Sequence, residues 1–373
     1  MGHDNKESEA KEEVILKNCR LVITKDENGR LLENVDILLK DGHIIEIGTI
    51  KDKKGIILDC SNALITPSFT DAHMHLICHD MTKAHSFARM VLLSALVNGV
   101  TNAVIFTNVP NVVMATAKEV GIHVRLAISP EEYKRFSNRE MANTIISIED
   151  PLSLPDLIES IDRVVELHIH ISESRNEVFT FKRKYKRTPI AWLLDRNLSV
   201  EKVYLVNPNW IASWELELFK KLKPCIIWSP STSMYRALDG FFPYKELSAL
   251  RVPLAIGSCD SASLSISLLD ELKIGSLLLK YNYWDPSLYI SLNAVTTVGE
   301  RIMGVPVGCV KIGYLADLIL FDIKRLMAKG LDLKNIERAF IEKVSSHDIM
   351  MVISRGNVAY SRSRLPQVLE GVY

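Results

Sequence analysis

The sequence predicts an α/β fold, a (β/α)8 TIM-type barrel with a small β-sandwich domain formed by the N- and C-terminal segments. From Leu64 onward, short apolar runs alternate with helical stretches, which is typical of βαβ units around a parallel sheet. Eight such strand segments can be recognised, the number in this barrel. The two ends of the chain contain only short strands, so we expect them to pair with each other.

The pattern divides the 373 residues into four segments. They are a polar, disordered tail (1–13), the N-terminal part of the β-sandwich (14–62), a (β/α)8 barrel (63–308) and the C-terminal part of the β-sandwich (309–373). Turn signals such as Asp41-Gly42 and Arg355-Gly356 separate apolar, β-branched runs in the two terminal parts.

The barrel strands are expected where apolar runs end in polar residues. They are Leu64–Thr66 running into Asp71–His75, Thr101–Thr107, His123–Ser129, Thr144–Ile148, Val164–Ile171, Lys202–Val206, Pro224–Trp228 and Leu254–Gly257. Helices are expected at Ser86–Asn98, Leu154–Arg163, Arg175–Lys186, Trp210–Lys221 and Ser263–Lys280. Active sites of such barrels lie at the carboxyl ends of the strands, so the polar residues there are the functional candidates.

Composition excludes several classes of partner. Lys+Arg and Asp+Glu both number 45, which gives no electrostatic reason to expect a nucleic acid or an anionic membrane surface. No apolar run approaches membrane-spanning length. Six scattered cysteines, without a Cys-x-x-Cys pair, predict neither a disulfide framework nor a thiolate zinc site. We therefore expect a cytoplasmic protein with neither a nucleic acid nor a membrane as its partner.

Four of the ten histidines fall in two His-x-His pairs, His73/His75 and His168/His170. Residues i and i+2 of a strand point to the same face, so both imidazoles of a pair can reach one ion inside the barrel. Neutral imidazole is the commonest metal ligand. Each pair alone is a weak signal, but both end predicted barrel strands, and together they predict a metal site.

Two carboxylates follow predicted strands at the same end of the barrel. Glu173 comes three residues after His170, and Asp260 follows the eighth strand. Asp260 could bind a metal, accept a proton or only cap the next helix. A site of three histidines and one aspartate leaves a position open for water, whose pKa the metal would lower from about 15.7 to roughly 7.

The sequence resembles the amidohydrolase superfamily, most closely its branch of cytosine-, guanine- and adenosine-type deaminases and chlorohydrolases. The resemblance covers nearly the whole chain after the tail. Its motifs are Ala63–Leu76, which includes the first His-x-His pair, His170-Ile171-Ser172-Glu173, Gly257-Ser258-Cys259-Asp260-Ser261 and Gly313-Tyr314-Leu315-Ala316-Asp317-Leu318. The third matches the family's Gly-Thr-Asp pattern with one residue altered or inserted.

The resemblance implies that His73, His75, His170 and Asp260 hold one divalent metal ion, zinc first, with iron or manganese as alternatives. Glu173 would carry protons to the substrate, and Asp260 would accept the proton of the attacking water. Asn207, Trp228 and His168 are assigned to substrate binding. Relatives often form homo-oligomers, which is the one protein partner implied.

Two departures from the family pattern leave other functions open. Strand six normally ends in a histidine, but no histidine lies between His170 and His347, and Asn207 stands at this position. A two-metal site is therefore not expected, and Glu149, after strand four, is interpreted as a loop carboxylate. The segment after His75 also lacks the family's long insertion.

The predicted activity is hydrolysis of a non-peptide C–N bond in a small cyclic amidine, amide or aminated heterocycle. The alternatives are a catalytically degenerate protein, or a metal enzyme of another reaction type on the same scaffold.

Overall fold

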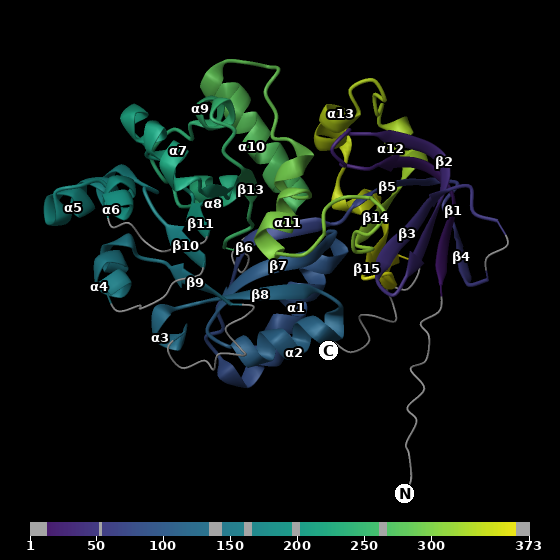
Figure 1. Ribbon diagram of the computed structural model, residues 1–373, viewed down its shortest axis with the longest axis horizontal. Coiled ribbons are helices and arrows are strands. Elements are labelled where there is room, and N and C mark those ends of the chain that lie inside the picture. The colour runs from purple at the N-terminus through teal and green to yellow at the C-terminus, as the bar shows by residue number, and fades with distance from the viewer. Residues whose placement is uncertain are drawn as a thin grey trace, which may run out of the picture.

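The structure is a computed structural model that describes residues 13–51, 54–133, 144–159, 166–195, 202–260 and 267–362. Its two halves lie side by side, a barrel and a smaller sheet in which the N-terminal strands, purple in Figure 1, lie beside the yellow C-terminal ones. The predicted tail, 1–13, lies outside the described residues except for Glu13, which pairs with Lys40. No helix in the described ranges is long and apolar enough to cross a membrane.

Eight parallel strands form the barrel, in chain order around the sheet. They are β6 (Phe69–Leu76), β7 (Val100–Thr107), β8 (His123–Ile128), β9 (Thr144–Ile148), β10 (Glu166–His170), β11 (Lys202–Val206), β12 (Cys225–Trp228) and β13 (Leu254–Ile256). The barrel closes where Cys259, three residues past β13, bridges in parallel to Met74 of β6. The predicted barrel is confirmed, with strand bounds close to those expected.

Helices cover the outside of the barrel and one of its ends. They are α1 (Ala84–Val97), α2 (Pro110–Val120), α3 (Pro130–Tyr133), α4 (Leu154–Glu159), α5 (Arg175–Tyr185), α6 (Pro189–Asp195), α7 (Phe219–Leu222), α8 (Pro230–Tyr235), α9 (Tyr244–Ala249), α10 (Leu268–Tyr283) and α11 (Val298–Met303). Short 3-10 helices are η1 (Met81–Lys83), η3 (Pro151–Ser153), η4 (Ser213–Leu218) and η5 (Leu292–Ala294). The helix expected at Trp210–Lys221 is instead η4 followed by α7. Parts of those expected at Leu154–Arg163 and Ser263–Lys280 lie outside the described residues.

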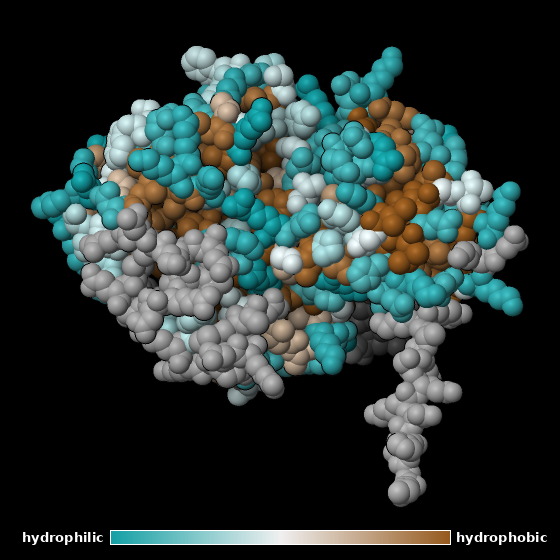
Figure 2. All heavy atoms as spheres, in the orientation of Figure 1, coloured by the Kyte–Doolittle hydropathy of each residue, from teal (hydrophilic) through white to brown (hydrophobic). Residues whose placement is uncertain are grey.

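The strands from the two ends of the chain form one further hydrogen-bonded sheet, in the order β16-β15-β14-β5-β1-β2-β3, with β4 against β1. Its strands are β1 (Val14–Ile23), β2 (Leu31–Lys40), β3 (His43–Gly48), β4 (Ile56–Asp59), β5 (Ala63–Pro67), β14 (Leu318–Asp322), β15 (Ile349–Ser354) and β16 (Asn357–Ser361). The helices α12 (Ile323–Ala328) and α13 (Ile336–Lys343) and the 3-10 helix η6 (Ser346–Asp348) connect β14 to β15. Figure 2 shows hydrophobic side chains gathered over this sheet, and hydrophobic patches among hydrophilic side chains over the barrel.

The segment Ala63–Pro67 was expected to lead into the first barrel strand, but it belongs to the small sheet. As β5 it pairs with β1 in parallel and with β14 in antiparallel fashion. The barrel strand β6 begins only after Ser68, whose hydroxyl contacts Thr101 Oγ1 at 2.5 Å. The chain therefore passes from one sheet to the other within two residues, and this fixes where β6 enters the barrel.

Alternate residues of each barrel strand face inward and form layers. Near the amino ends of the strands, Arg125 and Lys202 donate to Glu166 at 2.9 and 3.0 Å. Arg125 also donates to the carbonyl of Ile302 in α11, and buried apolar residues of this helix close that end of the barrel. This charged layer lies beneath the layer of histidines described below, because Glu166 precedes His168 and His170 on the same face of β10.

We expect Glu166→Ala to destabilise the protein by about 3–5 kcal/mol, because it leaves the buried guanidinium of Arg125 without its carboxylate. The exposed fractions of the two side chains are only 7% and 9%. Urea unfolding followed by circular dichroism measures the change. The control is Glu217→Ala, which breaks the exposed ion pair with Lys220 and should cost about 0–1 kcal/mol. Equal losses in the two variants would contradict the role of Glu166.

Candidate metal centre and active site

The first His-x-His pair is positioned by a β-bulge in β6. The pairing of β6 with β7 shifts register between Asp71 and Met74, and bulges of this kind re-aim side chains next to active sites. Asp71 Oδ1 accepts hydrogen bonds from the backbone N–H groups of His73 at 3.2 Å and Ser258 at 3.1 Å. The strand that carries the pair is thus tied to the segment after β13, across the seam that closes the barrel.

Three histidines bring their Nε2 atoms together at this seam, and we call them the Nε2 cluster: His73, His75 and His170. His73 Nε2 lies 2.8 Å from His75 Nε2 and 3.0 Å from His170 Nε2. His73 and His170 are buried, and the side chain of His75 is 13% exposed. The Sγ atom of Cys259 joins this group, since the four donor atoms lie within 4.8 Å of one another.

The chemistry of the Nε2 cluster fits one divalent metal ion. In a tetrahedral zinc site the ligand nitrogens are about 3.3 Å apart, close to the separations found here. Burial, and then the charges of His75 and His170, hold the pKa of His73 well below its usual value, so its imidazole is neutral, as a ligand must be. Burial also lowers the pKa of His75, but Asp260 and Glu149 outweigh it and raise the pKa to about 9. The surrounding carboxylates therefore stabilise positive charge at this point.

The opposite ring nitrogen of each clustered histidine faces a partner of its own. These Nδ1 contacts join His170 to Glu173 Oε1 at 2.8 Å, His75 to Asp260 Oδ1 at 3.4 Å, and His73 to His168 Nδ1 at 3.4 Å. Partners of this kind fix the tautomer and ring orientation of metal-ligating histidines. All three rings are therefore held with Nε2 directed to the common centre.

Glu149 lies in the site, and its interpretation as a loop carboxylate was wrong. It follows β9, and its Oε2 is 3.2 Å from His75 Nε2 and 3.4 Å from His170 Nε2. Ser147, two residues earlier on the same face of the strand, donates to Glu149 Oε1 at 2.6 Å. Burial alone would raise the pKa of Glu149, but the charge of His170 and the hydrogen bond to His75 hold it well below its usual range. A lone carboxylate after a strand carries no motif, so the sequence could not show this.

We expect Glu149→Gln to weaken zinc binding about 10–100-fold, the usual range when a side chain that supports the ligands is lost. The change removes negative charge next to two ligand nitrogens and keeps the shape of the side chain. Competition with a chromophoric chelator measures the dissociation constant. Glu131→Gln, an exposed carboxylate of α3, is the matched control. An unchanged zinc affinity in Glu149→Gln would show that the Glu149 carboxylate does not contribute to metal binding.

Glu173 is held beside the cluster by the start of α5. Glu177 accepts hydrogen bonds from the backbone N–H groups of Ser172 and Glu173, at 2.6 and 3.0 Å. Ser174 caps the helix. Burial alone would raise the pKa of the Glu173 carboxyl, but its hydrogen bond to His170 and the positive charge there hold the pKa below its usual value. Glu173 is therefore an anion at neutral pH, and Glu177 is a positioning residue that the sequence analysis missed.

Asp260 lies at the rim, one residue past the closing bridge of the barrel. Its two oxygens accept hydrogen bonds from Arg236 Nε at 2.7 Å and Arg236 Nη2 at 2.8 Å. Its backbone N–H lies 3.5 Å from Thr232 Oγ1. The hydrogen bond to His75, with Arg236 beside it, holds the pKa of Asp260 below its usual value. The carboxylate therefore approaches the Nδ1 side of His75, while the Nε2 side faces the cluster.

Asn207 occupies the end of β11, where the family pattern has a histidine. It is fully buried in a left-handed conformation with φ +49°, and its Oδ1 accepts a hydrogen bond from Ser229 N at 2.8 Å. Its Nδ2 makes no hydrogen bond to the described residues, although it lies close enough to Glu173 to help lower the pKa of that carboxyl. A buried amide donor is thus left beside Glu173.

The other two residues assigned to substrate binding are packed among other side chains. Trp228 packs in the layer between strands and helices, where its ring stacks on Phe242 at 4.2 Å, while its neighbour Ile227 faces the barrel interior. His168 lies deeper in the barrel than His170, and its ring packs on Tyr204 at 4.5 Å. Burial lowers the pKa of His168 to about 3. The structure therefore brings Asn207 close to Glu173. It brings neither Trp228 nor the ring of His168 there.

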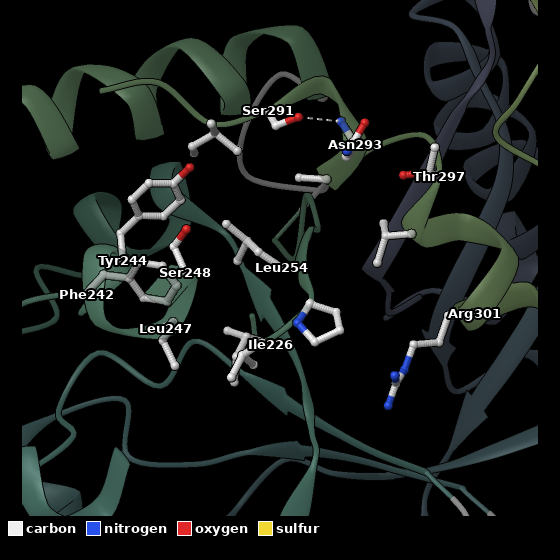
Figure 3. A pocket seen from close by; sticks show the side chains of 15 residues that line it. Ile226, Phe242, Tyr244, Leu247, Ser248, Leu254, Ser291, Asn293, Thr297 and Arg301 are labelled. Carbon is white, nitrogen blue, oxygen red and sulfur yellow. Dashed lines mark hydrogen bonds between the residues drawn. The ribbon is translucent and has the colours of Figure 1, made fainter. Parts of the chain in front are cut away.

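A cavity of about 470 Å³ lies at the opposite, amino-terminal end of β12 and β13. Figure 3 shows Tyr244 and Leu247 on one side of it, Arg301 on the other, and Ile226 and Leu254 between them. No histidine or carboxylate is among the described residues that line it. It is therefore separate from the metal centre, which lies at the carboxyl ends of the strands.

Comparison with known sequences agrees with this geometry. The sequence profile described as "Amidohydrolase family" matches residues 64–359. A 5-methylthioadenosine/S-adenosylhomocysteine deaminase of Pyrococcus furiosus is 24% identical over 347 residues, covering 78% of this chain and 82% of the relative. A 5'-deoxyadenosine deaminase of Methanothermobacter thermautotrophicus is 26% identical over 211 residues, covering 56% of this chain and 48% of the relative.

Solved structures share the whole fold. An adenosine deaminase from Xanthomonas campestris with bound zinc superposes with a TM-score of 0.79 at 16% identity, covering 96% of each chain. An atrazine chlorohydrolase from Arthrobacter aurescens, complexed with zinc, has a TM-score of 0.76 at 17% identity and covers 96% of this chain and 99% of its own. At these identities the likeness establishes the arrangement of barrel and second sheet.

Proposed function

Since this chain belongs to the amidohydrolase family, we propose that it is a metal-dependent hydrolase that breaks a C–N bond, other than a peptide bond, in a small molecule. The observation that carries the proposal is the convergence of the three Nε2 atoms at the carboxyl ends of the barrel strands. That is the end at which barrels of this type place their active sites. Zinc is the ion we assign, because three imidazole nitrogens at these separations suit it.

The reaction joins a water oxygen to the substrate carbon and releases the nitrogen as ammonia or an amine. A divalent ion bound by the cluster supplies a water-derived nucleophile at neutral pH. Glu173 is ionised and lies beside the cluster, so it takes up a proton and delivers it to the substrate nitrogen, which then leaves as a neutral amine. The free Nδ2 of Asn207 donates a hydrogen bond to the substrate from the same side.

The substrate class we propose is an aminated heterocycle, with cyclic amidines and amides as the wider group. Support comes from the relatives, which are deaminases of adenosine derivatives, and from an equivalent fold in an atrazine chlorohydrolase. The test is ammonia release, measured with zinc-loaded protein on adenosine, 5'-deoxyadenosine, 5-methylthioadenosine, guanine, cytosine and aminotriazines. Turnover of any of them supports the proposal. Zinc binding without ammonia release from the whole panel would exclude deamination of this class.

The second candidate is a barrel that has lost catalysis. It is favoured by Asn207, since an amide at the end of β11 cannot carry a proton as a histidine can. The retained Nε2 cluster, Glu149 and Glu173 favour the enzyme.

All six cysteines are free thiols, which suits a reducing compartment, and we place the protein in the cytoplasm.

A further inference from the structure

We propose that Cys259, and not Asp260, is the fourth protein ligand of the metal, so that the centre consists of three imidazoles and one thiolate. The inference rests on the proposed metal site and specifies its ligands. It replaces the sequence-based expectation of an aspartate ligand. It also assigns a thiolate zinc site that the spacing of the cysteines did not predict.

The backbone of Cys259 is fixed between the two histidines of β6. Its N–H donates to His73 O at 2.8 Å, and its carbonyl accepts from His75 N at 2.7 Å. Gly257 permits this approach, because a Cβ there would lie 2.7 Å from His73 O. The position of Cys259 is therefore set by the closure of the barrel itself.

Cys259 shares its backbone conformation with two other residues that follow barrel strands. Its φ is +47°, in the left-handed region, as at Ser172 after β10 and Asn207 after β11, with +54° and +49°. Residues other than glycine adopt this region at a cost of roughly 1–2 kcal/mol, and such conformations cluster at functional sites. Three strand ends around one centre share this conformation, as do several residues elsewhere in the described chain.

The sulfur is close enough to complete the ligand set. In tetrahedral zinc sites, with Zn–S of about 2.3 Å and Zn–N of about 2.0–2.1 Å, a sulfur and a nitrogen ligand are about 3.5 Å apart. Cys259 Sγ and the cluster nitrogens lie within 4.8 Å of one another, and Cys259 is fully buried. The four atoms are therefore near enough to share one ion after a small side-chain adjustment.

Asp260 is engaged on the wrong side of His75 to be a ligand. Its oxygens form a two-pronged pair with Arg236, a geometry that makes ion pairs strong. Its Oδ1 approaches His75 Nδ1, while His75 Nε2 faces the cluster. A carboxylate in that place orients a metal-bound histidine. Asp260 is therefore a positioning residue.

The sequence pattern is consistent with this assignment. Aligned without a gap, Gly257-Ser258-Cys259 takes the place of the Gly-Thr-Asp pattern, so the acid is altered to cysteine and no residue is inserted. A thiolate keeps the single negative charge of the carboxylate. Because soft thiolate ligands select zinc-like ions over magnesium or manganese, we expect zinc and cadmium to bind in preference to manganese.

Cobalt substitution tests the proposal in the full chain. A thiolate bound to Co(II) gives an intense charge-transfer band in the near ultraviolet, which nitrogen and oxygen ligands do not give. We expect this band in the wild type, in Asp260→Asn and in Cys309→Ser, a buried cysteine whose Sγ donates to Lys25 O in the other half of the molecule. We expect Cys259→Asp to bind about one cobalt per chain without the band. Cys259→Ser should lack the charge-transfer band as well.

The outcomes separate this proposal from the proposed function. Stoichiometric cobalt without the band in the wild type would overturn the thiolate ligand and leave the metal site intact. A band that persists in Cys259→Ser or disappears in Asp260→Asn would also overturn it. No cobalt or zinc bound to the wild type would overturn both. The wild-type spectrum decides even if a variant fails to fold.

Discussion

His170→Ala is expected to abolish stoichiometric zinc binding while leaving the fold intact. The change removes one of the three Nε2 atoms of the cluster, the one that lies 3.0 Å from His73 Nε2. Loss of a mere supporting partner weakens metal binding about 10–100-fold, so loss of a ligand should weaken it by more than about 100-fold. Inductively coupled plasma mass spectrometry of the purified variant gives the metal content. Circular dichroism gives the fold.

His85→Ala is the matched control for this prediction. His85 lies on α1, and its exposed ring pairs with Glu119 at 3.3 Å, outside the barrel. It should keep its zinc, so a loss common to both variants would point to handling and not to the site. Normal zinc content in a folded His170→Ala protein would contradict the assignment of His170 as a metal ligand.

Glu173→Gln is expected to keep zinc and to lower kcat about 10²–10⁴-fold, the usual contribution of a general acid–base group. A glutamine oxygen can still accept the hydrogen bond from His170 Nδ1, so the ring stays oriented. It cannot take up a proton from water or pass one to the leaving nitrogen. Steady-state kinetics on a substrate found by ammonia release measures kcat and KM separately, and we expect KM to change little.

Glu217→Gln serves as the control for Glu173→Gln. Glu217 is exposed and pairs with Lys220 at 2.5 Å, away from the strand ends that carry the site. Its kcat should equal that of the wild type. If Glu173→Gln also turned over at the wild-type rate, Glu173 would not be the proton carrier, and Glu149 would be the carboxylate to test next.

The sequence predicted the barrel well, because its strands are apolar runs bounded by polar residues. Thr144–Ile148 and Lys202–Val206 were expected with the bounds that β9 and β11 have. The pattern did not reveal α2, Pro110–Val120, whose apolar residues are largely β-branched or small. The pattern also could not assign Ala63–Pro67 to the small sheet, because the residues of a strand do not reveal which other strand it pairs with.

The site was predictable only where a motif carried it. The spacing of the paired histidines places each pair on one strand face, and Glu173 follows His170 by three residues, after the strand has ended. The structure brings His73, His75, His170 and Glu173 together. Glu149 comes from a neighbouring strand, and its approach to His75 depends on the closure of the barrel. The choice between Cys259 and Asp260 depends on which ring nitrogen each side chain faces, and a sequence does not contain that information.

The metal content of the full-length protein, purified without chelator, tests the central claim most directly. The geometry of His73, His75 and His170 predicts about one zinc ion per chain, either as isolated or after incubation with zinc. A folded chain that remains metal-free after incubation with zinc, iron, manganese and cobalt in turn would contradict the metal centre. It would make the catalytically degenerate barrel the better account of this protein.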